Sequence, residues 1–293
     1  MTLCSSLWLN AQNFIHPGML HTQADLDRTK AKVEAGEEPW ASAYRKLLTS
    51  PHVSLDWKAA PVEKIVRGGR TIWEPDPDNY QLAYRDAATA YQCALVWHIS
   101  GDKAYADKSV QILNAWAKTC KKVSGDTNAC LAYGLYGSQF ANPAELMRDY
   151  PGWNATDFGR FKEWMLKVWY HGVIGFLQGR NGTQDDHYWS NWGLCNVLCA
   201  MSIGILCDDV FIYNQATEYY KYMEDHRGEI MIIFAGYTKE MEEFLKTNPG
   251  LTSRVPNKFV FEDYTPDEIV EIGEKDLVKK QYQFEDEEYY AQQ

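Results

Sequence analysis

Residues 79–102 read NYQLAYRDAATAYQCALVWHISGD, and this stretch decides the expected fold. Its alanines and larger apolar residues return every three or four positions, which places them on one face of an α-helix. The positions on that face are Leu82, Ala83, Asp86, Ala87, Ala90, Tyr91, Ala94 and Leu95. Gly101 and Asp102 then end the pattern. The stretch predicts a long helix that buries one side in a core.

Helical patterns continue on both sides. Thr22 precedes an amphipathic run and Asp25 follows three positions later, which is the spacing of a capping box. Further helices are expected at 38–50, 103–120, 155–177, 187–209 and 210–221. Residues 50–78 hold six prolines and glycines and predict a long loop, and Gly, Ser and Asn predict loops between 121 and 154.

The first part of the chain therefore predicts an all-α domain, because no convincing strand interrupts the helices. Helices that pair with their neighbours in sequence favour an incomplete α/α toroid. Periodicity alone leaves a helical bundle as the alternative.

The composition changes near residue 222. Residues 1–221 hold 23 acidic and 21 basic side chains, whereas residues 222–293 hold 17 and 8. All eleven tryptophans and all seven cysteines lie before the change. Such a shift predicts a domain boundary, with one domain at 13–221 and another at 222–293.

The sequence of residues 222–293 predicts both strands and helices, as in a small α/β fragment. The apolar, β-branched run IMIIFA at 230–235 predicts a buried strand, and 258–264 predicts a second strand. A short amphipathic helix is expected at 239–250. Thr265, followed by Pro266 and then Glu268, has the pattern of a helix start.

Charge and hydropathy exclude several classes of function. A net charge of −11 argues against nucleic acid as a partner. No run reaches the roughly 18 apolar residues of a membrane span. The first residues lack a basic region, so a signal peptide is expected to be absent or truncated, although the sequons at Asn154 and Asn181 would suit a secreted chain.

The cysteine pair Cys195 and Cys199 has two readings. Four positions apart, both would share one helix face, either as buried core thiols or as half of a zinc site. No His or Cys partners stand at matching spacing, so we expect core thiols and no metal or other cofactor.

Four ordered stretches of residues 13–221 resemble the alginate lyase domain family of polysaccharide lyases. They are FIHPGMLHTQADLDRTKAKV, YRDAATAYQCALVWHISGDKAYADKSVQILNAWA, YGSQFANPAELMRDYPGW and HYWSNWGLCNVLCAMSIGILCDD. The resemblance implies an α/α toroid, an extracellular location and β-elimination on an acidic polysaccharide of the alginate or glucuronan type. Family members continue well beyond the position equivalent to residue 221.

β-Elimination needs a base near the C5 proton and donors that neutralise the uronate carboxylate. The resemblance implies a catalytic role for Asn142 and for His187. The competing readings are a helix N-cap at Asn142, with Glu145 completing a capping box, and a structural His187 oriented by Asp185 or Asp186.

Aromatic residues around His187 are candidates for stacking on sugar rings. Tyr188, Trp189 and Trp192 are expected either there or in the core, which is the usual place of a tryptophan. Tyr133 and Tyr136 are candidates for the base, but no motif singles out either of them.

Residues 222–293 resemble AAA+ ATPases of the sporulation protein K and rubisco-activase type, on AGYTKEM, NPGLTSR and the sequence around them. The resemblance implies that Arg254 matches an arginine finger, which acts on a nucleotide bound by a neighbouring subunit. No GxxxxGK[ST] motif occurs, so this chain is not expected to hydrolyse ATP.

Three functions follow from these resemblances. The first is a polysaccharide lyase, active or inactivated by loss of its later catalytic part. The second is a carbohydrate-binding or interaction protein without catalysis. The third is a subunit that donates Arg254 to an AAA+ ring.

Overall fold

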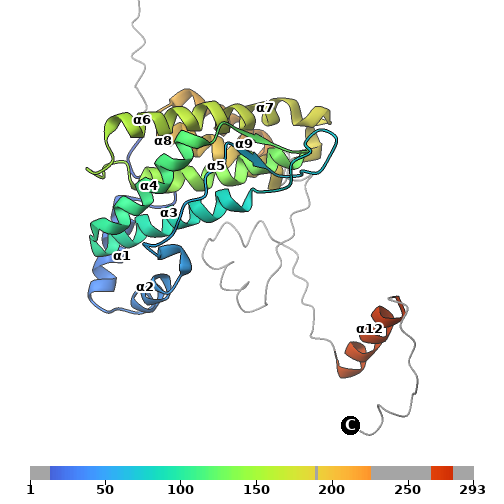
Figure 1. Cartoon of the computed structure of the whole chain (residues 1–293), viewed down its shortest axis with the longest axis horizontal. Coiled ribbons are helices and arrows are strands. Elements are labelled where there is room, and N and C mark those ends of the chain that lie inside the picture. The colour runs from blue at the N-terminus through green and yellow to red at the C-terminus, as the bar shows by residue number, and fades with distance from the viewer. Residues whose placement is uncertain (1–13, 189–190, 226–264, 280–293) are drawn as a thin grey trace, which may run out of the picture. The chain divides into compact units, whose positions relative to one another are not determined.

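The computed structural model describes residues 14–188, 191–225 and 265–279. The chain divides into two compact units, Met1–Met231 and Ile232–Gln293. In the first unit the described α-helices are α1 (Gln23–Glu34), α2 (Trp40–Leu48), α3 (Gln81–Ser100), α4 (Lys103–Thr119), α5 (Asn128–Leu146), α6 (Ala155–Trp164), α7 (His171–Gly179), α8 (Asn191–Cys207) and α9 (Val210–Asp225). The mainly helical class predicted from the sequence is confirmed (Figure 1).

Three of these helices, α3, α5 and α8, run in the same direction. Just before the first turn of α3, Tyr80 stacks on Tyr136 in the middle of α5, with 5.8 Å between ring centroids. Near their last turns, His98 Nε2 donates to the carbonyl oxygen of Leu146 at 2.9 Å. The α5–α8 pair is parallel as well, because Gly134 lies against Asn196 whereas Arg148 lies against the end of α8.

The remaining long helices return in the opposite direction. Ser109 of α4 donates to the Ala90 carbonyl at 2.8 Å, while Trp116, two turns later, donates to Asp86 near the start of α3. A π-helical segment, η2 (Met165–Tyr170), joins α6 to α7, so the single helix expected at 155–177 is continuous but locally widened. Parallel helices with antiparallel returns are the repeating hairpins from which an α/α toroid is built.

Two features of the fold differ from the sequence-based expectation. Helix α5 fills most of the region that we expected to be loop, because its glycines pack against α8 and do not break the helix. Two three-residue strands, β1 (Lys64–Val66) and β2 (Lys122–Ser124), form a parallel pair where only loop was expected. Strands this short carry too few positions for alternation to be visible in the sequence.

Helix α5 lies in the middle of the core. Phe140 on α5 is fully buried and contacts Trp164 edge to face at 5.2 Å, and Trp164 in turn contacts Trp169 at 5.5 Å. The buried carboxylate of Asp86 accepts hydrogen bonds from the indoles of Trp57 and Trp116, both at 2.7 Å. These bonds explain how an aspartate can lie on the apolar face of α3.

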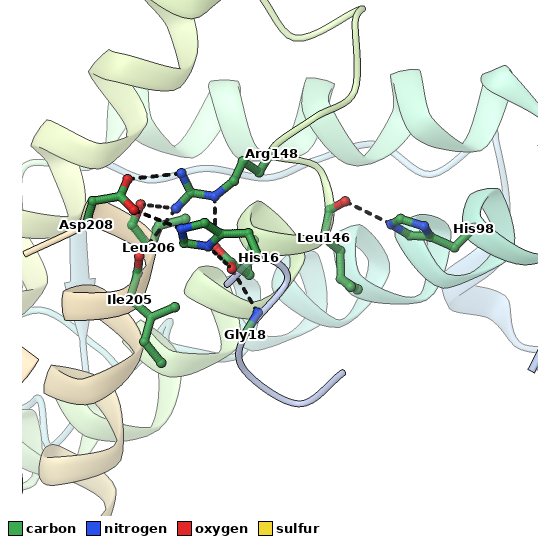
Figure 2. A network of polar contacts seen from close by, with 9 residues as sticks. His16, Gly18, His98, Leu146, Arg148, Ile205, Leu206 and Asp208 are labelled. Carbon is green, nitrogen blue, oxygen red and sulfur yellow. Dashed lines mark hydrogen bonds and ion pairs between the residues drawn. The ribbon is translucent and has the colours of Figure 1, made fainter. Parts of the chain in front are cut away.

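A polar cluster, which we call the clamp, ties the segment before α1 to the last turns of α5 and α8 (Figure 2). His16 contacts Glu145 Oε1 through Nδ1 at 2.6 Å and Asp208 Oδ1 through Nε2 at 2.8 Å. Arg148 donates to the Leu206 carbonyl at 2.6 Å and to Asp208 at 3.1 Å. Arg148 thus caps α8, whose last carbonyls have no partner within the helix.

Of the second unit, the structure describes α12 (Pro266–Lys279). Thr265 Oγ1 accepts from the Glu268 amide at 3.3 Å, and the Glu268 carboxylate accepts from the Thr265 amide at 2.8 Å. The expected helix start is confirmed. The strands expected at 230–235 and 258–264 and the helix at 239–250 lie outside the described residues.

Candidate functional site

Of the sequence-predicted aromatic residues, Tyr133, Tyr136, Tyr188 and Trp192 are described, and they lie in or before the first halves of α5 and α8. We call the end at which α3, α5 and α8 begin the starting end. The β1–β2 pair also lies here, since the Arg67 amide donates to the Ser124 carbonyl at 3.0 Å and the Asn79 amide donates to Val66 at 3.1 Å. Asn196 near the start of α8 donates to the Cys130 carbonyl near the start of α5 at 3.1 Å. Helices and strands of different hairpins therefore meet at one end.

Arg67 is the central cation of the starting end. Its Cζ lies 5.0 Å from the ring centroid of Tyr80 and 5.7 Å from that of Tyr136, and its Nη1 donates to the Tyr136 hydroxyl at 2.8 Å. The two tyrosine rings are stacked on each other. A guanidinium has five N–H donors in a rigid fork, so Arg67 can bind a carboxylate while it keeps the bond to Tyr136.

The tyrosines of α5 are not free bases. Burial raises the pKa of Tyr136 to about 12, although the charge of Arg67 acts in the opposite direction. Burial also raises the pKa of Tyr133, whose hydroxyl donates to the Val123 carbonyl at 2.9 Å. Both phenols therefore stay protonated at neutral pH, and Tyr136 serves to hold the guanidinium of Arg67.

His187 lies on the short 3₁₀ segment η4 (Asp185–Tyr188) just before α8. Its side chain is exposed, and its ring meets the Tyr188 ring edge to face at 4.6 Å. An exposed imidazole beside an aromatic ring can exchange a proton with a bound substrate. The side chains of Asp185 and Asp186, which were considered as orienting groups, lie outside the described part.

Tyr188 and Trp192 are half-buried and stack on each other with centroids 5.2 Å apart. Phe176 of α7 packs against Tyr188 edge to face at 5.1 Å, and Asn181 donates to the Tyr188 hydroxyl at 3.3 Å. These rings join the core and keep part of their surface in solvent, so the core reading holds in part, and stacking on sugar rings stays a prediction. Trp189 lies outside the described residues.

Asn142 lies away from His187. It is inside α5, so the N-cap reading is wrong: Pro143, which that reading makes the first residue of a helix, belongs to the interior of one. The Asn142 amide donates to the Ser138 carbonyl at 2.8 Å, and Glu145 bonds to the clamp. Gly134 is level with Cys195, so at 1.5 Å per residue Asn142 lies about 16 Å along the helix axis from Trp192.

The cysteine pair is part of the core, as expected. Cys199 is fully buried against Gly137, and Cys195 donates to the Trp192 carbonyl at 3.3 Å. Burial raises the pKa of the Cys195 thiol to about 11. Within the described ranges, no group of three or more His, Cys, Asp or Glu side chains is placed to hold a metal ion.

Sequence reasoning missed Arg67 and Tyr80. Arg67 belongs to the loop expected at 50–78, where VRGGR was read only as loop sequence. The available signal was an arginine between a short apolar run and two glycines, a place where backbone can come close to another element. Tyr80 was read as part of the α3 pattern.

These features define a helical domain with a cation and aromatic rings at one end. The sequence model of the alginate lyase family matches residues 22–227, which is more than half of the chain. The chain belongs to the alginate lyase family. A solved structure of an alginate lyase from Bacteroides ovatus is similar over 73% of this chain and 66% of that chain, with 13% identity and a TM-score of 0.44.

A second set of relatives confirms the other resemblance. A CfxQ homolog from Cyanidium caldarium is 50% identical over 72 residues, which are 24% of this chain and 25% of the relative. The stage V sporulation protein K of Bacillus subtilis is 42% identical over 67 residues, which are 23% of this chain and 21% of that protein. The chain thus spans about a quarter of the length of these relatives or less. Arg254 lies outside the described residues, and its role stays a prediction.

None of the described helices is long and apolar enough to cross a lipid bilayer.

Proposed function

We propose that this protein acts on a uronic-acid polymer, of the alginate or glucuronan type, by β-elimination outside the cell. The observation that carries the proposal is the match of the alginate lyase family over residues 22–227. The starting end supports it with chemistry, because Arg67 offers donors to a carboxylate and His187 offers an exposed base.

In this mechanism, Arg67 binds the carboxylate beside C5 and withdraws charge from it. The C5 proton then becomes more acidic, and the His187 imidazole accepts it. The electron pair left on C5 forms a C4–C5 double bond as the C4–O bond breaks, and the leaving oxygen takes a proton from solvent. Asn142 lies about 16 Å along the axis from Trp192 and is given no step in this mechanism, so its catalytic role stays a prediction.

Formation of the unsaturated product from alginate and from glucuronan, followed by its ultraviolet absorbance, tests the reaction. We expect His187→Ala to lower kcat about 10²- to 10⁴-fold, the usual contribution of a general base. Arg67→Ala should lower kcat/KM by about 10²- to 10³-fold, and Arg67→Lys should restore part of that loss. The matched control is Arg85→Ala, which removes an exposed arginine of α3.

Wild-type protein without turnover on either polymer would reject the lyase reaction. Equal rates for wild type and His187→Ala would reject the role of His187 as the base and would leave the lyase reaction itself standing. Thermal unfolding of each variant separates loss of chemistry from loss of fold.

A second candidate is binding of acidic polysaccharide without catalysis. It is favoured by one observation: the hydroxyls of Tyr133 and Tyr136 are both engaged, and the pKa of each is raised. Neither tyrosine is then a deprotonated base beside His187. Binding of the same polymers without product would select this candidate.

A further inference from the structure

The loop at residues 69–78, between β1 and α3, presents two large apolar side chains to solvent. Ile72 is 89% exposed and Trp73 is 81% exposed. Single apolar residues on a surface are common, but a tryptophan at the tip of a loop places a large flat ring where a ligand can reach it.

The loop holds its tip in a fixed position. The Gly69 amide donates to Asp78 at 2.7 Å, the Arg70 amide to the Asp76 carbonyl at 3.1 Å, and the Thr71 amide to the Glu74 carbonyl at 2.9 Å. These bonds cross the loop at three levels. Ordering the tip before a ligand arrives lowers the entropy cost of binding.

Glu74 follows the two exposed residues Ile72 and Trp73, which we call the tip, and anchors them to the strand pair. Its side chain is almost fully buried, with Lys64 Nζ at 2.7 Å from Oε1 and the Ser124 hydroxyl bonded to Oε2. Lys64 belongs to β1 and Ser124 to β2, so the tip is tied to the strand pair beside Arg67. The tip therefore moves with the starting end and not as an independent loop.

Arg70 adds a charge to the same loop, three positions before Trp73. Its side chain is exposed, and it forms no hydrogen bond or ion pair with any of the residues that the structure describes. Asp76 is not its partner, because the Asp76 carboxylate lies 2.6 Å from Lys64. A free guanidinium favours a carboxylate, which it can bind with two parallel hydrogen bonds.

We propose that Arg70 and Trp73 form an outer binding subsite for an acidic sugar unit, separate from the reacting unit at Arg67. The C–H groups of one sugar face pack on the indole of Trp73, whose π face is electron-rich, and the carboxylate of the same or the next unit pairs with Arg70. Trp73 lies six positions after Arg67, so their Cα atoms are at most about 20 Å apart, a span that a short oligosaccharide bridges.

This subsite rests on the proposed function in taking a uronate polymer as the ligand. Titration calorimetry of the full chain with alginate polymer tests it without any need for turnover. We expect Trp73→Ala to weaken binding about tenfold, as for a tryptophan that a bound ligand covers. Trp73→Phe should restore part of the lost affinity. The matched control is Ile72→Ala, which removes the neighbouring exposed apolar side chain and should change the Kd less than twofold.

The charge has its own test. Arg70→Gln should weaken binding at low salt and make it less sensitive to added salt, whereas Arg70→Lys should keep the salt dependence. Dextran, a neutral polymer, should bind more weakly than alginate and should not distinguish wild type from Arg70→Gln.

Several outcomes overturn the subsite. Binding by Trp73→Ala equal to that of wild type removes it, and so does an equal loss with Ile72→Ala, which would indicate a general apolar contact. A change in the oligomeric state of Trp73→Ala, measured by sedimentation, would assign the tip to a contact between protein chains.

The two proposals fail separately. Turnover of alginate by wild type, with an unchanged polymer Kd for Trp73→Ala, removes the subsite and keeps the lyase reaction. Trp73-dependent binding of alginate without any product removes the reaction and keeps the subsite. Wild type that neither binds nor converts alginate removes both.

Discussion

Two glycines of α5 set how closely it approaches α8. A Cβ on Gly134 would lie 2.8 Å from the backbone nitrogen of Asn196, and one on Gly137 would lie 2.5 Å from the Cys199 sulfur. Backbone cannot yield as a flexible side chain can. These positions explain why a sequence rich in glycine forms a central helix: the residues that weaken the helix in isolation allow its tightest packing.

Gly134→Ala should therefore destabilise the protein by about 1–3 kcal/mol, the usual cost of overpacking a core. The matched control is Gly175→Ala in α7, where a Cβ would meet nothing within 4 Å. Because alanine is the better helix former, Gly175→Ala should stabilise by about 0.5–1 kcal/mol. Urea unfolding of both variants measures the difference, and changes of the same sign would contradict the packing argument.

At the residue scale, the resemblance singles out His187 as a candidate, whereas nothing in the sequence singles out Arg67. The motif around His187 is local, so its residues can be read together. The setting of Arg67 depends on Tyr80 and Tyr136, which are 13 and 69 positions away and meet it only after α3 and α5 have packed. Contacts of this kind leave no periodic signal in one sequence.

At the scale of elements, helices with clear end signals were predicted well. The capping box of α1 is present as expected, with the Asp25 amide donating to Thr22 at 3.2 Å, and Gly101 ends α3 in a left-handed conformation. Helix α5 was missed because packing against α8 overrides its low intrinsic propensity. The β1–β2 pair was missed because three residues cannot show alternation.

The β1–β2 pair depends on an ionised Glu74. Hydrogen bonds from Lys64, then from Ser124, hold the pKa of the Glu74 carboxyl at about 2, below the ordinary 4.5. A pKa that is lower in the folded state stabilises the fold above the unfolded value, and the contribution is lost as the pH falls. We expect stability to decline between about pH 4.5 and pH 2, and Glu74→Gln to be less stable at neutral pH with a flatter decline.

Chemical denaturation at a series of pH values measures this slope. Glu63→Gln, which changes an exposed carboxylate one residue before β1, is the control and should follow wild type. A Glu74→Gln variant with the same slope as wild type would show that other carboxylates set the acid sensitivity.

At the scale of the whole molecule, α8 has a face without a described partner. The helix carries no charged residue from 191 to 207, yet Leu198 is 52% exposed and Leu194 is 37% exposed on one side of it. A helix that is apolar on all sides is usually covered on all sides. A face of this kind is what we expect where a further helical hairpin of an α/α toroid would pack.

Leu198→Glu should change the free energy of unfolding by less than about 0.5 kcal/mol if the face is open to solvent. Ile203→Glu, on the same helix but fully buried, should cost more than about 3 kcal/mol because it places a charge in the core. Guanidinium unfolding compares the two. A loss for Leu198→Glu as large as that for Ile203→Glu would mean that another part of the chain or a second chain covers the face.

The predicted boundary at 221/222 falls inside α9, which runs to Asp225. Met223 is buried against Gly193, and Arg180 lies 6.0 Å from the Tyr222 ring. These residues belong structurally with the lyase-like helices. The composition changes near residue 222, but α9 packs as one helix as far as Asp225, so the first unit extends beyond the change.

The clamp also has a consequence for synthesis. His16 bonds to Glu145 and Asp208, which are made 129 and 192 positions later in the chain. At about 5–20 residues per second, a ribosome needs on the order of ten to forty seconds between making His16 and making Asp208. Glu145 is made earlier, but the clamp stays incomplete until Asp208 is made, so the His16–Asp208 contact belongs to the last stage of folding, after translation has passed α8.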